Sequence, residues 1–139
     1  MKFKYLVSSN SLDTRGHHTK RPLIKLEQIT LDGKIFYSYG LIDSGADQTM
    51  VNIQYANVLG IDLSKSPERK MNGIAEGAVI TKVANFTIKS IDLGEEITVP
   101  ACFVDSKNVD ILIGQEGFFD NFRIKFEKDH DTFEITKKR

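Results

Sequence analysis

The chain has 139 residues, and its 19 lysines and arginines balance its 19 aspartates and glutamates, so its formal net charge is zero. A chain of this length is predicted to fold as one domain that builds its core without disulfides or a structural metal. The neutral balance gives no electrostatic attraction toward nucleic acid or an anionic membrane, so neither is expected as a partner. The lone Cys102 cannot form an internal disulfide, no apolar run is long enough to span a bilayer, and the run ending at Val7 is too short for a signal peptide. The expected location is therefore the cytoplasm.

Residues 1–20 are expected to form an N-terminal strand and loop extension, and residues 21–139 the main domain. Within the extension, residues 8–20 are polar and show no periodicity, so they are predicted to be a loop that follows a short first strand. The main domain begins with residues that favour β-structure. Its Asp32-Gly33 pair separates two apolar segments, which predicts a hairpin whose second strand runs into Asp43.

The rest of the chain is predicted to alternate short strands with turns. Asn52 can cap a helix over 53–59 that Gly60 ends, and a further helical turn or two is expected over 115–120. The segment Met71–Gly77 carries two glycines between β-like flanks and is typical of a hairpin tip. The remaining strands are predicted over 49–51, 79–88, 97–104, 110–114, 122–126 and 132–135. This pattern favours an all-β fold with a closed or barrel-like sheet.

The most informative segment runs from Gly40 to Thr49. An apolar strand delivers Asp43 onto a tight Ser44-Gly45 turn, and no cationic residue lies within three positions of this carboxylate. A carboxylate is costly to place there without a function. Asp, Ser and Gly are also the commonest residues of ordinary turns, so a plain turn stays open as an alternative. The apolar residues on both sides favour a functional site.

Two motifs together resemble those of the retropepsin-like aspartic proteases. The segment Leu41-Ile42-Asp43-Ser44-Gly45-Ala46 has the two apolar residues and the Asp-Ser/Thr-Gly-Ala sequence that mark this family. The segment Ile111-Leu112-Ile113-Gly114 has the apolar residues and the glycine of its second motif, and the hairpin tip at 71–77 lies between the two, where the family keeps its flap. The end of the chain is similar to the small bacterial and archaeal single-domain members, and the resemblance spans residues 22–135.

The resemblance implies an all-β, retropepsin-like closed barrel of short strands with a flap hairpin and one or two short helices. It also implies a role for each matching residue: catalysis by Asp43; the active-site turn by Ser44, Gly45 and Ala46; substrate contacts by Asp47, Gly73, Ile74, Ala75, Glu76 and Gly77, the last five in the flap; and the second motif by Ile113 and Gly114.

Peptide hydrolysis at such a site uses two carboxylates that share one proton, because like charges held close together cannot both ionise. The chain has a single Asp-Ser/Thr-Gly sequence, so the second aspartate is expected to come from the second chain of a homodimer. The implied activity is that of an aspartic endopeptidase acting on polypeptides, with no metal and no cofactor. An arginine of the retroviral members is replaced here by the uncharged Gln115, so a weak or substrate-stabilised dimer is expected.

Two other functions stay open from the sequence alone. One is a retropepsin-like domain with weak or lost catalysis that serves as a dimerisation or peptide-binding module. The other is a β-barrel binding module in which Asp43 is only a turn residue. Cys102 is expected to be a buried core residue because no histidine lies near it in a comparable context, and His17, His18 and His130 are expected to be solvated.

Overall fold

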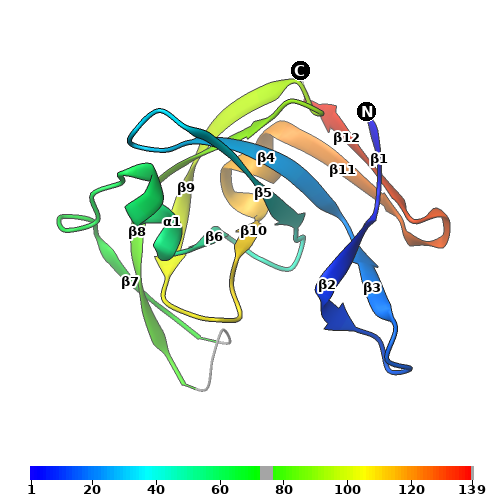
Figure 1. Cartoon of the computed structure of the whole chain (residues 1–139), viewed down its shortest axis with the longest axis horizontal. Coiled ribbons are helices and arrows are strands. Elements are labelled where there is room, and N and C mark those ends of the chain that lie inside the picture. The colour runs from blue at the N-terminus through cyan, green and yellow to red at the C-terminus, as the bar shows by residue number, and fades with distance from the viewer. Residues whose placement is uncertain (73–76, 139) are drawn as a thin grey trace.

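The computed structural model describes residues 1–72 and 77–138 and consists mostly of strands (Figure 1). The strands are β1 (Lys2–Lys4), β2 (Leu6–Leu12), β3 (His18–Arg21), β4 (Leu23–Ile29), β5 (Ile35–Ile42), β6 (Thr49–Asn52), β7 (Glu68–Met71), β8 (Val79–Ser90), β9 (Glu95–Val104), β10 (Ile111–Ile113), β11 (Phe122–Glu127) and β12 (Thr132–Lys137). The α-helix of the described residues is α1 (Gln54–Leu59), and short turns of other helical types span Gln115–Phe119 and Lys128–His130.

Most strands belong to a seven-stranded sheet in the order β4-β5-β10-β6-β9-β8-β7, which is accompanied by the three-stranded sheet β1-β12-β11 and the two-stranded sheet β2-β3. The large sheet curls so that β4 approaches β8, and Lys89 Nζ lies 3.4 Å from Glu27 Oε1 across this seam. Backbone ladders nevertheless leave β4 and β7 as edge strands within the described residues. The predicted all-β class is confirmed. The predicted closed barrel is wrong, because side-chain contacts rather than backbone pairing bridge the seam.

The first hairpin of the large sheet forms where the Asp32-Gly33 pair predicts it. β4 pairs antiparallel with β5, from Leu23 opposite Leu41 to Ile29 opposite Ile35. Buried side chains alternate along β4 with exposed or half-buried ones, as expected for a strand with one face on the core. This hairpin carries the chain to Asp43, directly after β5.

The short strand β10 lies between β5 and β6 and brings the two sequence motifs together. It pairs parallel with β5, where Leu112 lies opposite Leu41 and Ile113 opposite Ile42. On its other side it pairs antiparallel with β6, where Leu112 lies opposite Met50. The ends of β5 and β10 therefore meet at one edge of the sheet, with Asp43 and Gly114 as the next residues.

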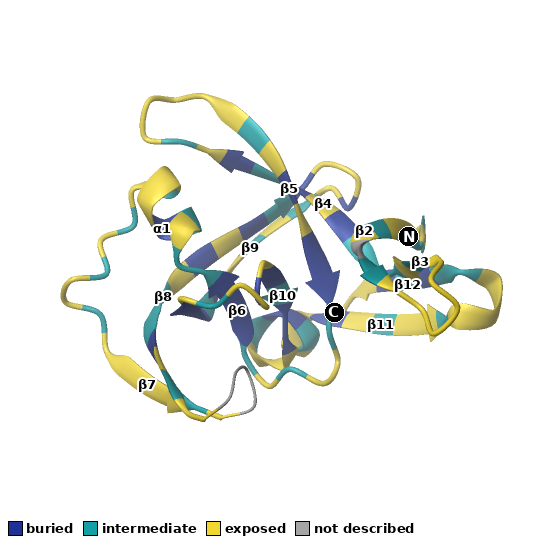
Figure 2. Ribbon diagram, turned by 60° about the horizontal axis from the view of Figure 1, so that its bottom comes forward, coloured by how far each residue is buried: buried dark blue, intermediate teal, exposed yellow. Residues whose placement is uncertain are grey.

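Buried residues gather in the central strands, whereas β7 and β11 are mostly exposed (Figure 2). Four fully buried phenylalanines belong to the main core: Phe86, Phe103, Phe118 and Phe133. Phe86 and Phe103 meet edge to face, with 6.3 Å between ring centroids, and Phe118 stacks on Phe122 at 4.8 Å. Cys102 is 2% exposed, so its predicted burial is confirmed. The core thus anchors β9 and the 115–119 turn, which support the end of β10.

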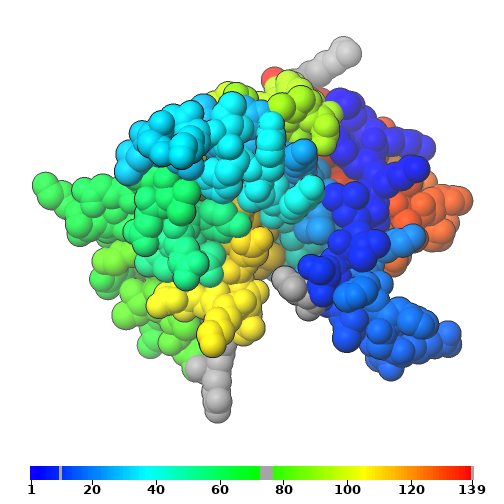
Figure 3. Space-filling view, viewed as in Figure 1, coloured from blue at the N-terminus to red at the C-terminus, as the bar shows by residue number. Residues whose placement is uncertain are grey.

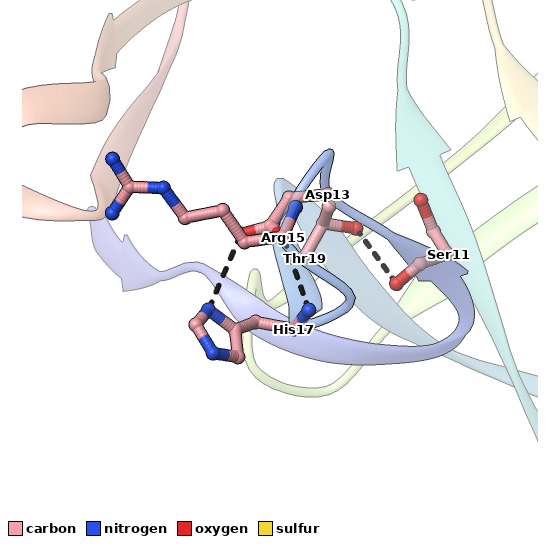
Figure 4. A network of polar contacts seen from close by, with 5 residues as sticks. All are labelled: Ser11, Asp13, Arg15, His17 and Thr19. Carbon is pink, nitrogen blue, oxygen red and sulfur yellow. Dashed lines mark hydrogen bonds and ion pairs between the residues drawn. The ribbon is translucent and has the colours of Figure 1, made fainter.

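The polar segment 8–20, predicted to be a loop, instead forms most of a hairpin in which β2 pairs antiparallel with β3. Asp13 fixes its turn, because Asp13 Oδ1 accepts the backbone N–H groups of Arg15 at 2.8 Å and His17 at 2.9 Å (Figure 4). A ladder and turn of this kind need no buried face, so the side chains carry no periodic signal. The hairpin lies beside the large sheet rather than within it (Figure 1).

The two predicted helices differ in outcome. α1 lies close to its predicted range, with the Gln54 N–H donating to Asn52 Oδ1 at 3.0 Å at its start and Gly60 at its end. The segment after Gly114 is not a regular helix, because Glu116 is extended (φ −64°, ψ 124°) and Gly117 takes a positive φ of 82°. A Cβ at Gly117 would lie 2.7 Å from Val99 Cγ1. The expected helical turn is therefore present over Gln115–Phe119 but is interrupted at Glu116 and Gly117, where the chain packs closely on β9.

Candidate active site

Asp43 is the first residue after β5, and the neighbouring strand β10 holds its backbone. The Asp43 N–H donates to Ile113 O at 3.0 Å, which continues the pairing of the two strands by one residue. Its side chain is half-buried. The strand pairing therefore fixes the backbone of Asp43, from which the carboxylate extends toward solvent.

The turn that follows orients this carboxylate. Asp43 Oδ1 accepts the Gly45 N–H at 2.9 Å, and Asp43 O accepts the Ala46 N–H at 3.2 Å. No second donor among the described residues binds the carboxylate. A Cβ at position 45 would lie 3.3 Å from Asp43 Oδ1, so a glycine leaves room for this close approach. One carboxylate oxygen is thus held, and the other is free to contact a water molecule or a substrate.

The second motif packs directly against the same turn. The Gln115 N–H donates to Ala46 O at 2.9 Å, and the Glu116 N–H donates to Asp47 O at 2.9 Å. At Gly114 a Cβ would lie 2.4 Å from Gln48 O and 2.7 Å from Ala46 O, which are backbone atoms that cannot give way. Only glycine fits at this position without moving the active-site turn.

Gln115 also binds the turn through its side chain. Gln115 Nε2 donates to Ser44 O at 2.7 Å, so the residue that replaces an arginine of the retroviral members holds the backbone of its own turn. Ser44 and Asp47 are both exposed. Their side chains therefore face solvent or a partner rather than the interior of this chain.

Asp43 borders a hollow of about 420 Å³ that is open to solvent. The active-site turn forms one side of it, through Gly45, Ala46, Asp47 and Gln48. Met71 and Asn72, at the end of β7, form a second side, and the segment around Val109 forms a third. A volume of this size fits several residues of an extended peptide beside the carboxylate.

The hairpin expected to carry the flap is present in its two arms. β7 pairs antiparallel with the start of β8, from Glu68 opposite Lys82 to Met71 opposite Val79. Gly77, at the base of the second arm, is exposed and has a positive φ of 83°. The other residues assigned to the flap, Gly73, Ile74, Ala75 and Glu76, lie outside the described residues.

The structure brings most predicted site residues together at one edge of the sheet. Asp43, Gly45, Ala46 and Asp47 line the hollow, while Ser44, Ile113 and Gly114 support the turn from behind or beside it. Thr49 was not singled out, although its Oγ1 accepts the Gly114 N–H at 3.2 Å. In the sequence, Thr49 could have been recognised as a polar residue at the start of an apolar strand. In the structure Thr49 is fully buried, with 0% of its surface exposed.

The three histidines are exposed, as predicted, and stand away from Asp43. Across residues 1–72 and 77–138, no three His, Cys, Asp or Glu side chains gather where a metal ion could bind. No helix in the described part of the chain has the length and apolar character to cross a membrane.

Comparisons with known proteins identify the family of this fold and site. The family model described as "gag-polyprotein putative aspartyl protease" matches residues 28–119. The crystal structure of a retropepsin-like aspartic protease from Rickettsia conorii matches with a TM-score of 0.56 and 19% identity, covering 98% of this chain and 98% of that chain. The foamy viral protease-reverse transcriptase bound to an RNA/DNA hybrid matches with a TM-score of 0.44 and 16% identity, over 68% of this chain and 11% of that chain. No curated protein sequence matches this chain. The chain belongs to the retropepsin-like aspartic proteases.

Proposed function

We propose that this protein is an aspartic endopeptidase that works as a homodimer, with Asp43 of each chain supplying one carboxylate of a shared site. The observation that carries the proposal is the geometry of Asp43. The Gly45 N–H holds one carboxylate oxygen, the other has no partner among the described residues, and the group faces an open hollow. A carboxylate oriented in this way can hold a catalytic water.

Hydrolysis would proceed with one proton shared between the two carboxylates. The ionised Asp43 takes a proton from water as the water oxygen attacks the peptide carbonyl carbon, and the protonated Asp43 gives its proton to the carbonyl oxygen. In the resulting diol the C–N bond then breaks: one carboxylate protonates the nitrogen, and the other takes a proton from the diol. The pair returns to its starting state with one proton, and no covalent intermediate forms.

The second chain is needed because the chain supplies one Asp-Ser/Thr-Gly sequence. A two-fold axis beside the turn would bring the same residue from each chain to one water molecule. Ser44 is exposed on that turn, and by the resemblance its hydroxyl would bond to the partner's turn and hold the two aspartates in place. Asp47 would line the cleft on either side.

The β7–β8 hairpin is proposed to be the flap. Two observations support this proposal: Met71 and Asn72 border the hollow at Asp43, and β7 pairs with β8 as the two arms of a hairpin. Closure over the substrate would exclude water and order the peptide as an extended strand. We propose the cytoplasm as the site of this activity, because a single free, buried cysteine fits a reducing compartment.

The test is cleavage of a peptide library by the wild-type protein and by an Asp43→Asn variant, with Asp129→Asn as the matched control. Asp129 is an exposed aspartate on the last hairpin, so its loss leaves the site unchanged. We expect Asp43→Asn to lower kcat/KM by about 10²–10⁴-fold or more, since it removes the general acid and base. Unchanged cleavage by this variant would overturn the mechanism.

A mixing experiment tests the shared site itself. When Asp43→Asn chains are added in excess to wild-type chains, mixed dimers carry one carboxylate, so wild-type activity is expected to fall in proportion to the wild-type dimers lost. Activity that stays constant would show that one chain carries a complete site.

Gln115 favours a second candidate function. Its amide is used within its own chain, where the retroviral members have a charged residue, and this makes a catalytically weak dimerisation or peptide-binding module the alternative. Sedimentation combined with the cleavage and peptide-binding assays separates the two candidates. A dimer that binds peptides without cutting them would support the module.

A further inference from the structure

A second hollow adjoins Asp43 on the side away from β7. The N-terminal hairpin borders it through Val7, Ser8 and Ser9 of β2, and the segment around Lys107 borders it from the opposite side. Figure 3 shows this depression between the dark-blue N-terminal strands and the yellow segment near residue 107. The hollow measures about 670 Å³ and is open to solvent.

The two hollows form one groove. Asp43, Asn108 and Leu112 line both of them, so the catalytic carboxylate stands where they join. An extended peptide that presents a bond to Asp43 must continue to both sides of that bond. One side of such a peptide then lies beside Met71 at the end of β7, and the other enters the hollow beside β2.

β2 can offer a strand edge to that peptide. It belongs to a two-stranded sheet in which β3 is its partner, so its other edge is unpaired by any described strand. Its register with β3 also shifts: residues 8–11 of β2 and Thr19 alone of β3 lie between the pairs Val7–Lys20 and Leu12–His18. A bulge of this kind bends a strand and re-aims its backbone groups.

We propose that β2 forms one wall of the substrate groove, and that the substrate lies along β2 as an added strand on one side of the bond that is cut. This inference rests on the proposed function, because it assumes that Asp43 acts on a peptide. Substrate selection by strand addition uses backbone hydrogen bonds for affinity and side-chain pockets for choice of residue.

The side chains beside β2 also indicate which class of peptide would bind. Val7, Leu23, Tyr39 and Leu41 give the hollow an apolar floor near β2, and Val7 is 61% exposed. The charged residues that line the same hollow are Arg21, Asp43, Lys107 and Asp110. A peptide with an apolar side chain at the position facing Val7 fits this floor. An acidic or basic side chain packed on this apolar floor would lose hydration without gaining a polar partner from it.

The chain offers a matched pair of variants for the test. Val7 and Leu12 are both apolar residues of β2 with nearly equal exposure, 61% and 59%, but only Val7 lines the hollow. We expect Val7→Asp to lower kcat/KM about 10-fold or more for peptides with an apolar residue at the facing position, and to favour peptides with lysine there. Leu12→Asp should leave the preference of the wild type unchanged.

Peptide binding is measured in parallel with cleavage, so that a failure of the β2 proposal can be distinguished from a failure of the proposed protease function. Fluorescent peptides selected from the library are titrated into Asp43→Asn protein that carries either Val7→Asp or Leu12→Asp, and anisotropy gives Kd. Weaker binding with Val7→Asp alone supports the β2 wall even if no peptide is cleaved. If all β2 variants cleave peptides as fast as the wild type and with the same preference, β2 is not a wall of the substrate groove. The proposed protease function would be unaffected by that result.

Sedimentation of the same variants decides between a peptide and a second copy of the chain as the occupant of the hollow. The proposal expects Val7→Asp to leave the monomer–dimer equilibrium unchanged. A loss of dimer with Val7→Asp, together with an unchanged peptide preference among the dimers that remain, would assign β2 to the interface and overturn the proposal.

Discussion

Thr49 lies in the buried layer beneath the active-site turn, and its hydroxyl is the acceptor for the Gly114 N–H at 3.2 Å. Both residues are buried, so this N–H has no access to water if the hydroxyl is lost. A buried donor without an acceptor costs about 1–3 kcal/mol, more than the bond itself contributes when formed. Thr49 therefore positions Gly114, and through it the backbone against which Asp43 is held.

This role predicts a difference between two small substitutions. Thr49→Val keeps the shape of the side chain but removes the acceptor, and we expect it to lower the free energy of unfolding by about 1–3 kcal/mol. Thr49→Ser keeps the hydroxyl and removes one methyl group, for an expected loss of about 0.5–1.5 kcal/mol. Urea denaturation ranks the two. A valine variant as stable as the wild type would show that the hydroxyl does not hold Gly114.

At the scale of residues, sequence reasoning finds the groups whose chemistry is unusual for their position. Asp43 follows an apolar strand, and Gly114 ends another, so both stand out along the chain. Thr49 and Val7 do not, because their importance depends on which strands lie beside them. Thr49 matters through β10, and Val7 through the hollow that β2 shares with Asp43.

At the scale of elements, Tyr55 ties α1 to the segment that precedes β10. Its hydroxyl donates to Asp110 Oδ1 at 2.6 Å, and its ring stacks on Phe36 with 6.4 Å between centroids. Burial, and next the hydrogen bond and negative charge of Asp110, raise the pKa of Tyr55 above its ordinary value. The folded protein therefore favours the neutral phenol.

The sign of the pH effect follows from this shift. In the unfolded chain a tyrosine ionises near pH 10, whereas Tyr55 in the folded chain keeps its proton to higher pH. Above about pH 10 the unfolded state binds fewer protons than the folded state, so stability falls as the pH rises. We expect Tyr55→Phe to be less stable at pH 7 but to lose less stability between neutral and strongly alkaline pH.

Thermal unfolding as a function of pH measures this effect, with Tyr37→Phe as the control because Tyr37 is 51% exposed. The control is expected to keep the alkaline loss of the wild type. The same loss in Tyr55→Phe as in the wild type would contradict a role for the Tyr55 phenol.

Elements could be predicted where an apolar face or a strong turn signal marks them. The β4–β5 hairpin follows from alternating burial and Asp32-Gly33, and α1 from Asn52 and Gly60. The β2–β3 hairpin could not, because the Asp13 turn and backbone pairing hold it without a buried face. The helical turn over 115–119 was predicted, but its irregular backbone at Glu116 and Gly117 was not, because it involves packing of Gly117 on Val99 of a distant strand.

At the scale of the whole molecule, the large sheet is open between β4 and β8, and the proposed site has one Asp-Ser-Gly turn per chain. The seam between β4 and β8 shows that a predominantly β pattern with short strands predicts the class but not the closure of the sheet, because closure depends on register between strands far apart in the chain. The single Asp43 turn, by contrast, is visible in the sequence, and it is the basis of the proposal that a second copy of the chain completes the site.

The strength of the proposed dimer is the property that the molecule as a whole leaves to experiment. Within one chain, the Gln115 side-chain amide donates to Ser44 O, and Gln115 carries no charge to attract a partner. The zero net charge of the chain opposes association only weakly. We therefore expect a dimer that dissociates in the micromolar range, with activity per chain that rises with protein concentration and levels off once dimers dominate.

Analytical ultracentrifugation and activity assays over the same concentrations measure both quantities, and the two midpoints should agree. Two copies joined by a long Gly/Ser linker serve as the control, because a linker makes association intramolecular and should give activity proportional to concentration at all dilutions. Peptide substrate should shift the midpoint to lower protein concentration, since it binds both chains at once. A dimer that persists at nanomolar concentration would contradict weak association, and a fully active monomer would contradict the shared site itself.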